Sequence, residues 1–338
     1  LKATVTGKLD HEDFEVWKLH YQSIPRLYVT ANLYVPKGLK KPAPAILYVC
    51  GHGKVKKDGV SYGNKVHYQH HGIWFARHGY VCLTIDTLQL GEIEGIHHGT
   101  YNHDMWWWNS RGYSSASVEA WNSIRTLDYL ETLDFVDKNR FGVTGRSGGG
   151  AYSWWISVLD ERIKVSAPVA GITSLKNHVY AGFQNSGRLA HGVVEGHCDS
   201  MFHVNTYRWD FDHIAALVAP RPLMILNTDD DRIFPLDGVT DVFNGVRRIY
   251  DLHGQRNKLG LTIVPGGHSD TQPLQVPAFN WFNRHLKGEE GPITVAAVKL
   301  FEPEQLKVFN ELPGDSINAD IQETFTQLAD DKSKPSQK

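Results

Sequence analysis

Phe141-Gly142-Val143-Thr144-Gly145-Arg146-Ser147-Gly148-Gly149 is the most informative stretch of this sequence. Its first five residues have the pattern of a strand, and a helical stretch over 149–159 follows directly. The pattern between them, Gly-x-Ser-x-Gly, is typical of a sharp strand-to-helix turn that exposes a serine hydroxyl above a sheet. Such a turn needs small neighbours because the serine backbone is strained. We therefore interpret Ser147 as a nucleophile rather than as an incidental serine in a glycine-rich turn.

Strand-like and helix-like stretches alternate on both sides of this turn. Short runs typical of strands occur at 26–35, 45–50, 80–86, 163–169, 222–227 and 261–264. Helical spacing of apolar residues occurs at 65–78, 114–133, 237–252 and 275–286. This alternation predicts β–α–β units, and hence an α/β protein with a doubly wound, mostly parallel sheet. Its functional loops are expected at the carboxyl ends of the strands.

A nucleophilic serine needs a base and an acid, which follow it in the order Ser, acid, His in the α/β-hydrolase fold. His268 stands in the loop that follows the last predicted strand, and we expect it to be the base. The acid belongs to the loop 228–235, which contains three consecutive aspartates. Asp231 is preferred because Asp-x-x-x-Pro, leading into a helix, is the usual form of this loop. Asp229 is the alternative.

The oxyanion of an acyl-transfer reaction needs two backbone N–H donors. Gly148 is expected to supply one, and Gly53 or Lys54, in the loop after the strand 45–50, the other. His52 is interpreted as a brace for this loop rather than as a second base. The sequence offers four further residues as contacts for the substrate: His52, Arg146, Trp107 and His197.

Composition excludes several other functions. The formal net charge is only −2, and no apolar run approaches the roughly 20 residues that span a bilayer. We therefore expect neither nucleic acid nor a membrane as a partner. Cys50 and Cys82 lie in apolar runs and are expected to be small core residues. The chain begins without Met, so a secreted or periplasmic location with a removed signal peptide is one expectation, and a cytoplasmic one stays open.

The chain is expected to form one α/β-hydrolase domain over 1–290, which includes an N-terminal strand segment over 1–43. A C-terminal extension covers 291–338. It begins with a strand-like stretch, 293–301, and ends in a polar tail, 330–338, that is expected to be disordered.

Histidines gather around the loop 87–113 and further along the chain. These histidines and their neighbours resemble a metal cluster in composition, but their spacing fits no standard ligand motif: His97, His98, His103, His197, Cys198, Asp199 and His203. We therefore predict no metal and no cofactor. The ten tryptophans could stack on sugars, although core and lid packing explains most of them equally well.

Beyond the triad, the chain resembles the acetyl xylan esterase-like branch of the α/β-hydrolases, which is common in polysaccharide-degrading bacteria. The similar segments are 27–36, 51–54, 140–149, 196–199, 218–223, 301–306 and 311–313. The resemblance implies removal of acetyl groups from a xylan- or pectin-type carbohydrate, without metal or cofactor. The oxyanion loop departs from the cephalosporin-C and xylan deacetylases, since it reads His-Gly-Lys where they have His-Gly-Tyr.

The sequence therefore predicts a serine esterase that acts on an acetylated carbohydrate through an acyl-enzyme. The alternatives are a glucuronoyl methylesterase, which needs a cation such as Arg146 or Arg111 near the pocket, and a carboxylesterase for small esters. A peptidase of the prolyl-oligopeptidase type would normally carry an additional propeller. A non-catalytic carbohydrate-binding relative would not need an intact triad. The oligomeric state is not predicted.

Overall fold

The computed structural model describes residues 1–186 and 207–324. Within them nine strands form one sheet in the order β1-β2-β3-β7-β4-β8-β9-β10-β11. Strands β7, β4, β8, β9, β10 and β11 are mutually parallel, while β1, β2 and β3 add an antiparallel edge. The strands are β1 Thr4–Asp10, β2 Phe14–Ile24, β3 Leu27–Pro36, β4 Ala43–Val49, β7 Val81–Ile85, β8 Val136–Arg146, β9 Ile163–Val169, β10 Leu223–Thr228 and β11 Leu259–Val264. The predicted α/β class and mostly parallel sheet are confirmed.

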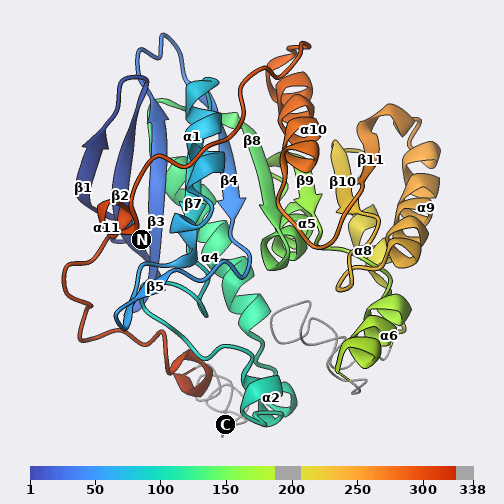
Figure 1. The fold of residues 1–338 in the computed structure, drawn as a ribbon, viewed down its shortest axis with the longest axis horizontal. Helices are drawn as coiled ribbons and strands as arrows, with labels where there is room; N and C mark the ends of the chain where they lie inside the picture. The colour runs from blue at the N-terminus through green and yellow to red at the C-terminus, as the bar shows by residue number, and fades with distance from the viewer. Residues whose placement is uncertain (187–206, 325–338) are drawn as a thin grey trace, which may run out of the picture.

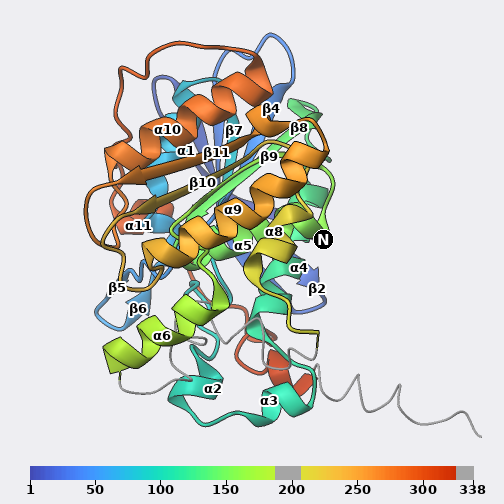
Figure 2. The same cartoon turned by 90° about the vertical axis from the view of Figure 1, so that its right-hand side faces the viewer.

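Helices cover both faces of this sheet, and Figure 2 shows α10 and α9 on opposite sides of β10 and β11. The helices of four residues or more are α1 Gln69–Arg77, α2 Gly99–Asn102, α3 Trp107–Ser110, α4 Ser115–Leu130, α5 Gly148–Leu159, α6 Leu175–Ser186, α8 Phe211–Ala216, α9 Leu236–Leu252, α10 Gln272–Phe282 with a π turn over Asn283–Lys287, and α11 Pro303–Leu306. Short 3-10 turns lie at Asn64–Val66 and Arg256–Lys258, and a small hairpin pairs β5 Lys56–Lys57 with β6 Val60–Ser61.

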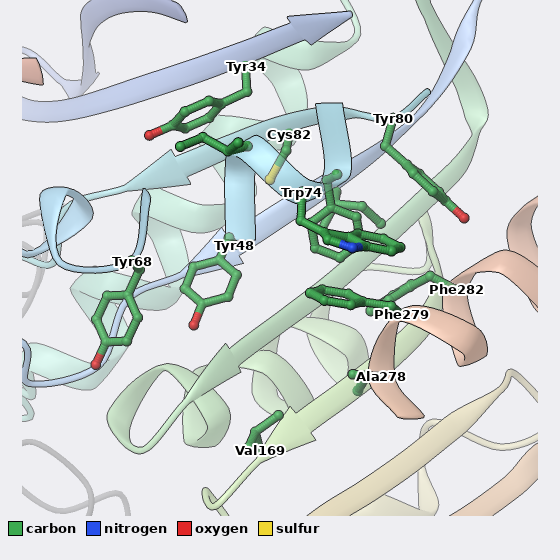
Figure 3. Packing of buried hydrophobic residues seen from close by; sticks show 14 of the residues in the cluster. Tyr34, Tyr48, Tyr68, Trp74, Tyr80, Cys82, Val169, Ala278, Phe279 and Phe282 are labelled. Carbon is green, nitrogen blue, oxygen red and sulfur yellow. The ribbon is translucent and has the colours of Figure 1, made fainter. Parts of the chain in front are cut away.

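The alternation of side chains along β4 explains why two layers of helices form. Ile46 and Tyr48 belong to a core with α1 and α10, while Leu47 and Val49 belong to a second core with α4 and α5. Successive strand residues point to opposite faces, so an uninterrupted apolar strand needs cover on both. In the first core the rings of Trp74 and Phe279 stack, with their centroids 3.7 Å apart (Figure 3).

The segment that follows α10 runs back over the domain. The predicted strand at 293–301 is wrong, because this segment is irregular and is held by side chains instead of by a neighbouring strand. Gln69 accepts hydrogen bonds from the backbone N–H groups of Leu300 and Phe301, and Trp74 donates to the carbonyl of Val295. The tail 330–338 lies outside the described residues.

A buried cation joins this segment to the sheet. Lys65 lies 2.8 Å from Asp86 and 2.6 Å from Glu92, and all three side chains are almost fully buried. Glu92 also accepts the N–H groups of Val308 and Phe309. Removing the charge of Lys65 would leave two buried carboxylates without their cation.

The carboxyl ends of β4 and β8 point toward α2 and α6 (Figure 1). Ser147, at the end of β8, therefore lies at the edge predicted for the functional loops. Within the described residues, no helix is long and apolar enough to cross a membrane. Cys50 and Cys82 are buried and form no disulfide, as expected for core residues.

Candidate active site

Ser147 lies between the last residue of β8 and the first residue of α5. Its backbone is strained, with φ of +60° and ψ of −124°. Gly145 and Gly149 make this turn possible, because a Cβ at either position would lie within 2.2 Å of the Val49 carbonyl oxygen. The Ser147 N–H donates to the carbonyl of Val169 at 2.9 Å, which holds the turn against β9. Strain of this kind is retained where it places a side chain for function.

The side chains of Ser147, His268 and Asp231 form one hydrogen-bonded chain. His268 Nε2 is 3.0 Å from Ser147 Oγ, and His268 Nδ1 is 2.7 Å from Asp231 Oδ2. The Asp231 carboxylate is fully buried, and the His268 side chain is 20% exposed. Since a carboxylate can only accept, Nδ1 carries the proton and Nε2 is free to accept one from the serine.

Asp231 is also fixed from its other side. Its Oδ1 accepts the backbone N–H groups of Ile233 and Phe234, at 2.9 and 3.0 Å. The alternative acid, Asp229, instead accepts the N–H of Gly266 at 2.8 Å and thereby braces the loop that carries His268. The geometry thus places Asp231, and not Asp229, against the histidine.

Two backbone segments meet beside Ser147 Oγ. Gly148 is the first residue of α5, where helix N–H groups have no intrahelical partner. The loop after β4 passes so close that a Cβ on Gly51 would lie 3.2 Å from that of Ser147. A Cβ on Gly53 would meet the ring of His67 at 2.5 Å. The exposed Lys54 ammonium pairs with Glu94, so any contribution of Lys54 to the oxyanion comes from its backbone.

The tentative substrate contacts have different environments. Arg146 is partly buried and lines a small cavity together with Tyr48 and Asp270. Trp107 packs against a hydrophobic cluster, with Arg111 over its ring at 6.0 Å, and the exposed member of the tryptophan triplet is Trp106. His197 lies outside the described residues.

A cleft of about 570 Å³ opens beside the acid loop. Residues 229–232 and 235–237 line it together with Ala181 of α6. The sequence reading did not single out Arg232, although its position directly after the acid was a usable signal. Asp231 is the triad member that lines this cleft, whereas Ser147 and His268 lie outside its lining.

His178 is a second residue that the sequence reading missed. It lies on α6 and is buried, and its ring packs against Phe234 with the centroids 5.6 Å apart. Burial lowers the pKa of His178 to about 4, so its imidazole is neutral near pH 7. Phe234 in turn stacks on His268, with ring centroids 5.8 Å apart. His178 therefore supports the acid loop through its contact with Phe234, and it does so as an uncharged group.

Asp270 fixes the histidine loop on its far side. Its Oδ2 lies 2.9 Å from His71 Nε2 and 3.3 Å from His70 Nε2, and its Oδ1 accepts from Gln275 at 3.0 Å. Burial raises the pKa of Asp270, but the two histidines outweigh it and leave the pKa well below its usual range. Because Asp270 follows His268 by two residues, these contacts tie the loop to α1 and α10.

Three further histidines meet next to the oxyanion loop. His52 lies in that loop, and His97 and His98 lie just before α2. His52 Nε2 is 3.3 Å from His98 Nε2, and the rings of His97 and His98 stack. Burial lowers the pKa of His52 to about 3, that of His97 to about 4 and that of His98 to about 2. All three imidazoles are neutral near pH 7.

Comparison with solved structures identifies the fold. Methylesterase BT1017 superposes with a TM-score of 0.68 at 20% identity, over 98% of this chain and 70% of its own. Acetyl xylan esterase 1 from Thermoanaerobacterium gives a TM-score of 0.56 at 14% identity, over 83% and 87%. The chain has the α/β-hydrolase fold.

Sequence comparisons point to esterases. A family model described as glucuronyl esterase of fungi matches residues 97–254. A 4-O-methyl-glucuronoyl methylesterase of Phanerochaete carnosa is 25% identical over 244 residues, which are 64% of this chain and 58% of that protein. YtaP of Bacillus subtilis, named only as a hydrolase, is 25% identical over 257 residues, 74% of this chain and 81% of its own.

These similarities confirm the predicted relationship to carbohydrate esterases at a coarse level. They do not single out the acetyl xylan esterase branch. The family model and the fungal relative favour the alternative, glucuronoyl esterases, over the main expectation.

Proposed function

We propose that the protein is a serine esterase that acts on a carbohydrate, and that its best substrate is an ester of a uronic acid. The observation that carries the esterase chemistry is the hydrogen-bonded chain from Asp231 through His268 to Ser147 at the start of α5. Acyl transfer needs such a nucleophile, base and orienting carboxylate in contact.

The reaction has two steps. His268 Nε2 takes the Ser147 proton as Oγ attacks the ester carbonyl, and the N–H groups of Gly148 and of Gly53 or Lys54 hold the oxyanion. His268 then protonates the leaving alcohol. A water molecule activated by the same imidazole releases the acid and restores the serine. Asp231 keeps the proton on Nδ1 and stabilises the imidazolium without becoming protonated itself.

The choice of substrate rests on the sequence comparisons together with the charges around the triad. The matched segment 97–254 includes Ser147 and Asp231, and both it and the fungal relative carry the name of glucuronoyl esterases. Arg146 directly precedes the nucleophile and Arg232 directly follows the acid. These two positions are neighbours of the triad in the chain, and a guanidinium that reaches the reaction centre would suit the carboxylate that hydrolysis of a uronoyl ester releases.

Deacetylation of a xylan- or pectin-type carbohydrate is the second candidate. The motif resemblance over 51–54, 140–149 and 218–223 favours it. The two reactions differ in which side of the ester is the sugar. A uronoyl ester leaves the sugar on Ser147 as the acyl group, whereas deacetylation leaves only acetyl. A secreted or periplasmic location suits either polymer-derived substrate.

Purified enzyme should be compared on three substrates: a methyl or benzyl ester of a glucuronoyl oligosaccharide, an acetylated xylan oligosaccharide and 4-nitrophenyl acetate. We expect kcat/KM for the glucuronoyl ester to exceed that for the acetylated sugar by about tenfold or more. Ser147→Ala is the control and should be inactive on all three. A preference for the acetylated sugar would refute the uronoyl assignment but keep the esterase. Activity on none of the three would refute both.

A further inference from the structure

His52, His97 and His98 bring three potential metal ligands together at the rim of the active site. One ligand nitrogen from each lies within 4.8 Å of the other two. His52 follows Gly51, whose backbone packs against Ser147, and the other two residues lie on the loop that leads into α2. The sequence shows no metal-binding motif here, because the ligands come from two loops: His52 and His97 are 45 residues apart in the chain.

The nitrogen separation fits a tetrahedral metal ion. Zinc–nitrogen bonds are about 2.0–2.1 Å long, so two ligands of a tetrahedral zinc lie about 3.3 Å apart. His52 Nε2 and His98 Nε2 are 3.3 Å apart. The third nitrogen, from His97, lies within 4.8 Å of both, and its ring must turn out of the stack with His98 to close the set around one ion.

Gln89 orients the cluster in the manner of a supporting residue of a metal site. Its Oε1 lies 2.6 Å from His97 Nδ1 and accepts the backbone N–H of His98. Gln89 Nε2 donates to Ser115 Oγ at 2.9 Å, which fixes the amide so that Oε1 faces the histidines. His97 Nδ1 must then carry the proton, and its Nε2 is left as a lone-pair donor. Metal-binding histidines are held in one tautomer by just this kind of partner.

The backbone of His98 provides an independent observation. Its φ of +52° and ψ of +55° are left-handed values, which few residues with a side chain adopt, although histidine does so more often than most. Such strain is retained where the position of the side chain matters. His52 and His97 are partly exposed, so an ion can reach the cluster from solvent.

We propose that His52, His97 and His98 bind one divalent zinc ion, with a fourth position open to water or to an oxygen ligand. The site takes a borderline-soft cation because its three ligands are all imidazoles. The proposal does not depend on the esterase activity. Its local consequence is that the ion fixes the loop 51–54 beside Ser147.

The test uses the full chain, freed of metal with a chelator and titrated with Zn²⁺ in a calorimeter. We expect one ion per chain. His97→Ala and His52→Ala should each weaken binding by at least about 100-fold, and Gln89→Leu by about 10- to 100-fold, as measured for supporting residues elsewhere. His253→Ala, an exposed histidine at the end of α9, is the matched control and should bind like the wild type.

Two results would overturn the proposal: no stoichiometric Zn²⁺ binding by the wild type, or unchanged affinity in His97→Ala. Circular dichroism checks that each variant folds. If a histidine variant does not fold, Co²⁺ bound to the wild type decides instead. A tetrahedral visible absorption spectrum supports the site, and its absence refutes it.

Discussion

The substitution Asp231→Asn tests the assignment of the acid most sharply, because the structure dictates how the new amide must lie. Asp231 Oδ1 accepts two backbone N–H groups, from Ile233 and Phe234. An asparagine can satisfy both only with its carbonyl oxygen on that side. Its NH₂ group must then face His268 Nδ1, which becomes an acceptor. The imidazole proton moves to Nε2. This nitrogen can then no longer accept the proton of Ser147.

The expected loss follows from this change of tautomer. In a serine protease with the same arrangement, the corresponding substitution lowers kcat about 10⁴-fold, and we expect the same order here. That loss corresponds to about 5 kcal/mol of activation free energy. The assay is kcat on 4-nitrophenyl acetate, measured beside a thermal melt to show that the fold survives.

Asp229→Asn is the matched control. Asp229 uses one carboxylate oxygen to accept the N–H of Gly266, and an amide oxygen can replace it. We expect this variant to keep its activity within severalfold. A loss in Asp229→Asn as large as that in Asp231→Asn, or less than a tenfold loss in Asp231→Asn, would show that the reasoning about the acid is wrong.

Three further predictions concern stability and are measured by urea unfolding. Gly149→Ala should cost about 1–3 kcal/mol, since its Cβ would lie 2.0 Å from the Val49 carbonyl, whereas Gly314→Ala, with no atom nearby, should change little. Lys65→Met should cost about 3–5 kcal/mol, because it leaves two buried carboxylates without their cation. Burial lowers the pKa of His178 to about 4 from its ordinary 6.5, so the unfolded chain takes up this proton first. Stability should therefore fall by up to about 3 kcal/mol from pH 6.5 to pH 4, and His178→Phe should remove that part of the slope.

The elements nearest to the nucleophile were predictable because their signals are local. The glycines around Ser147 can be read as a tight turn, and the apolar run before them as a buried strand. The choice of Asp231 over Asp229 came from its spacing to Pro235, and the structure brings Asp231 to His268. Each of these inferences depends on a few consecutive residues.

What the sequence could not predict are contacts between distant segments. His52 and His98 were each named from the sequence, but no spacing links them, and only the fold brings their nitrogens to 3.3 Å. The sequence shows that Asp270 follows His268 by two residues, but it does not show that Asp270 contacts His71 on α1. The strand predicted at 293–301 is wrong because an apolar alternation does not reveal whether a strand edge is available to pair with. Here Gln69 takes up the backbone N–H groups instead.

Covalent labelling of Ser147 tests the proposed chemistry most directly. Full-length protein is treated with a fluorophosphonate probe, digested and analysed by mass spectrometry. We predict stoichiometric modification of Ser147, with no labelling and at least about a 10⁴-fold loss of kcat in Ser147→Ala. Full activity in Ser147→Ala, or a wild-type enzyme that hydrolyses esters while Ser147 stays unlabelled, would contradict the assignment of the nucleophile.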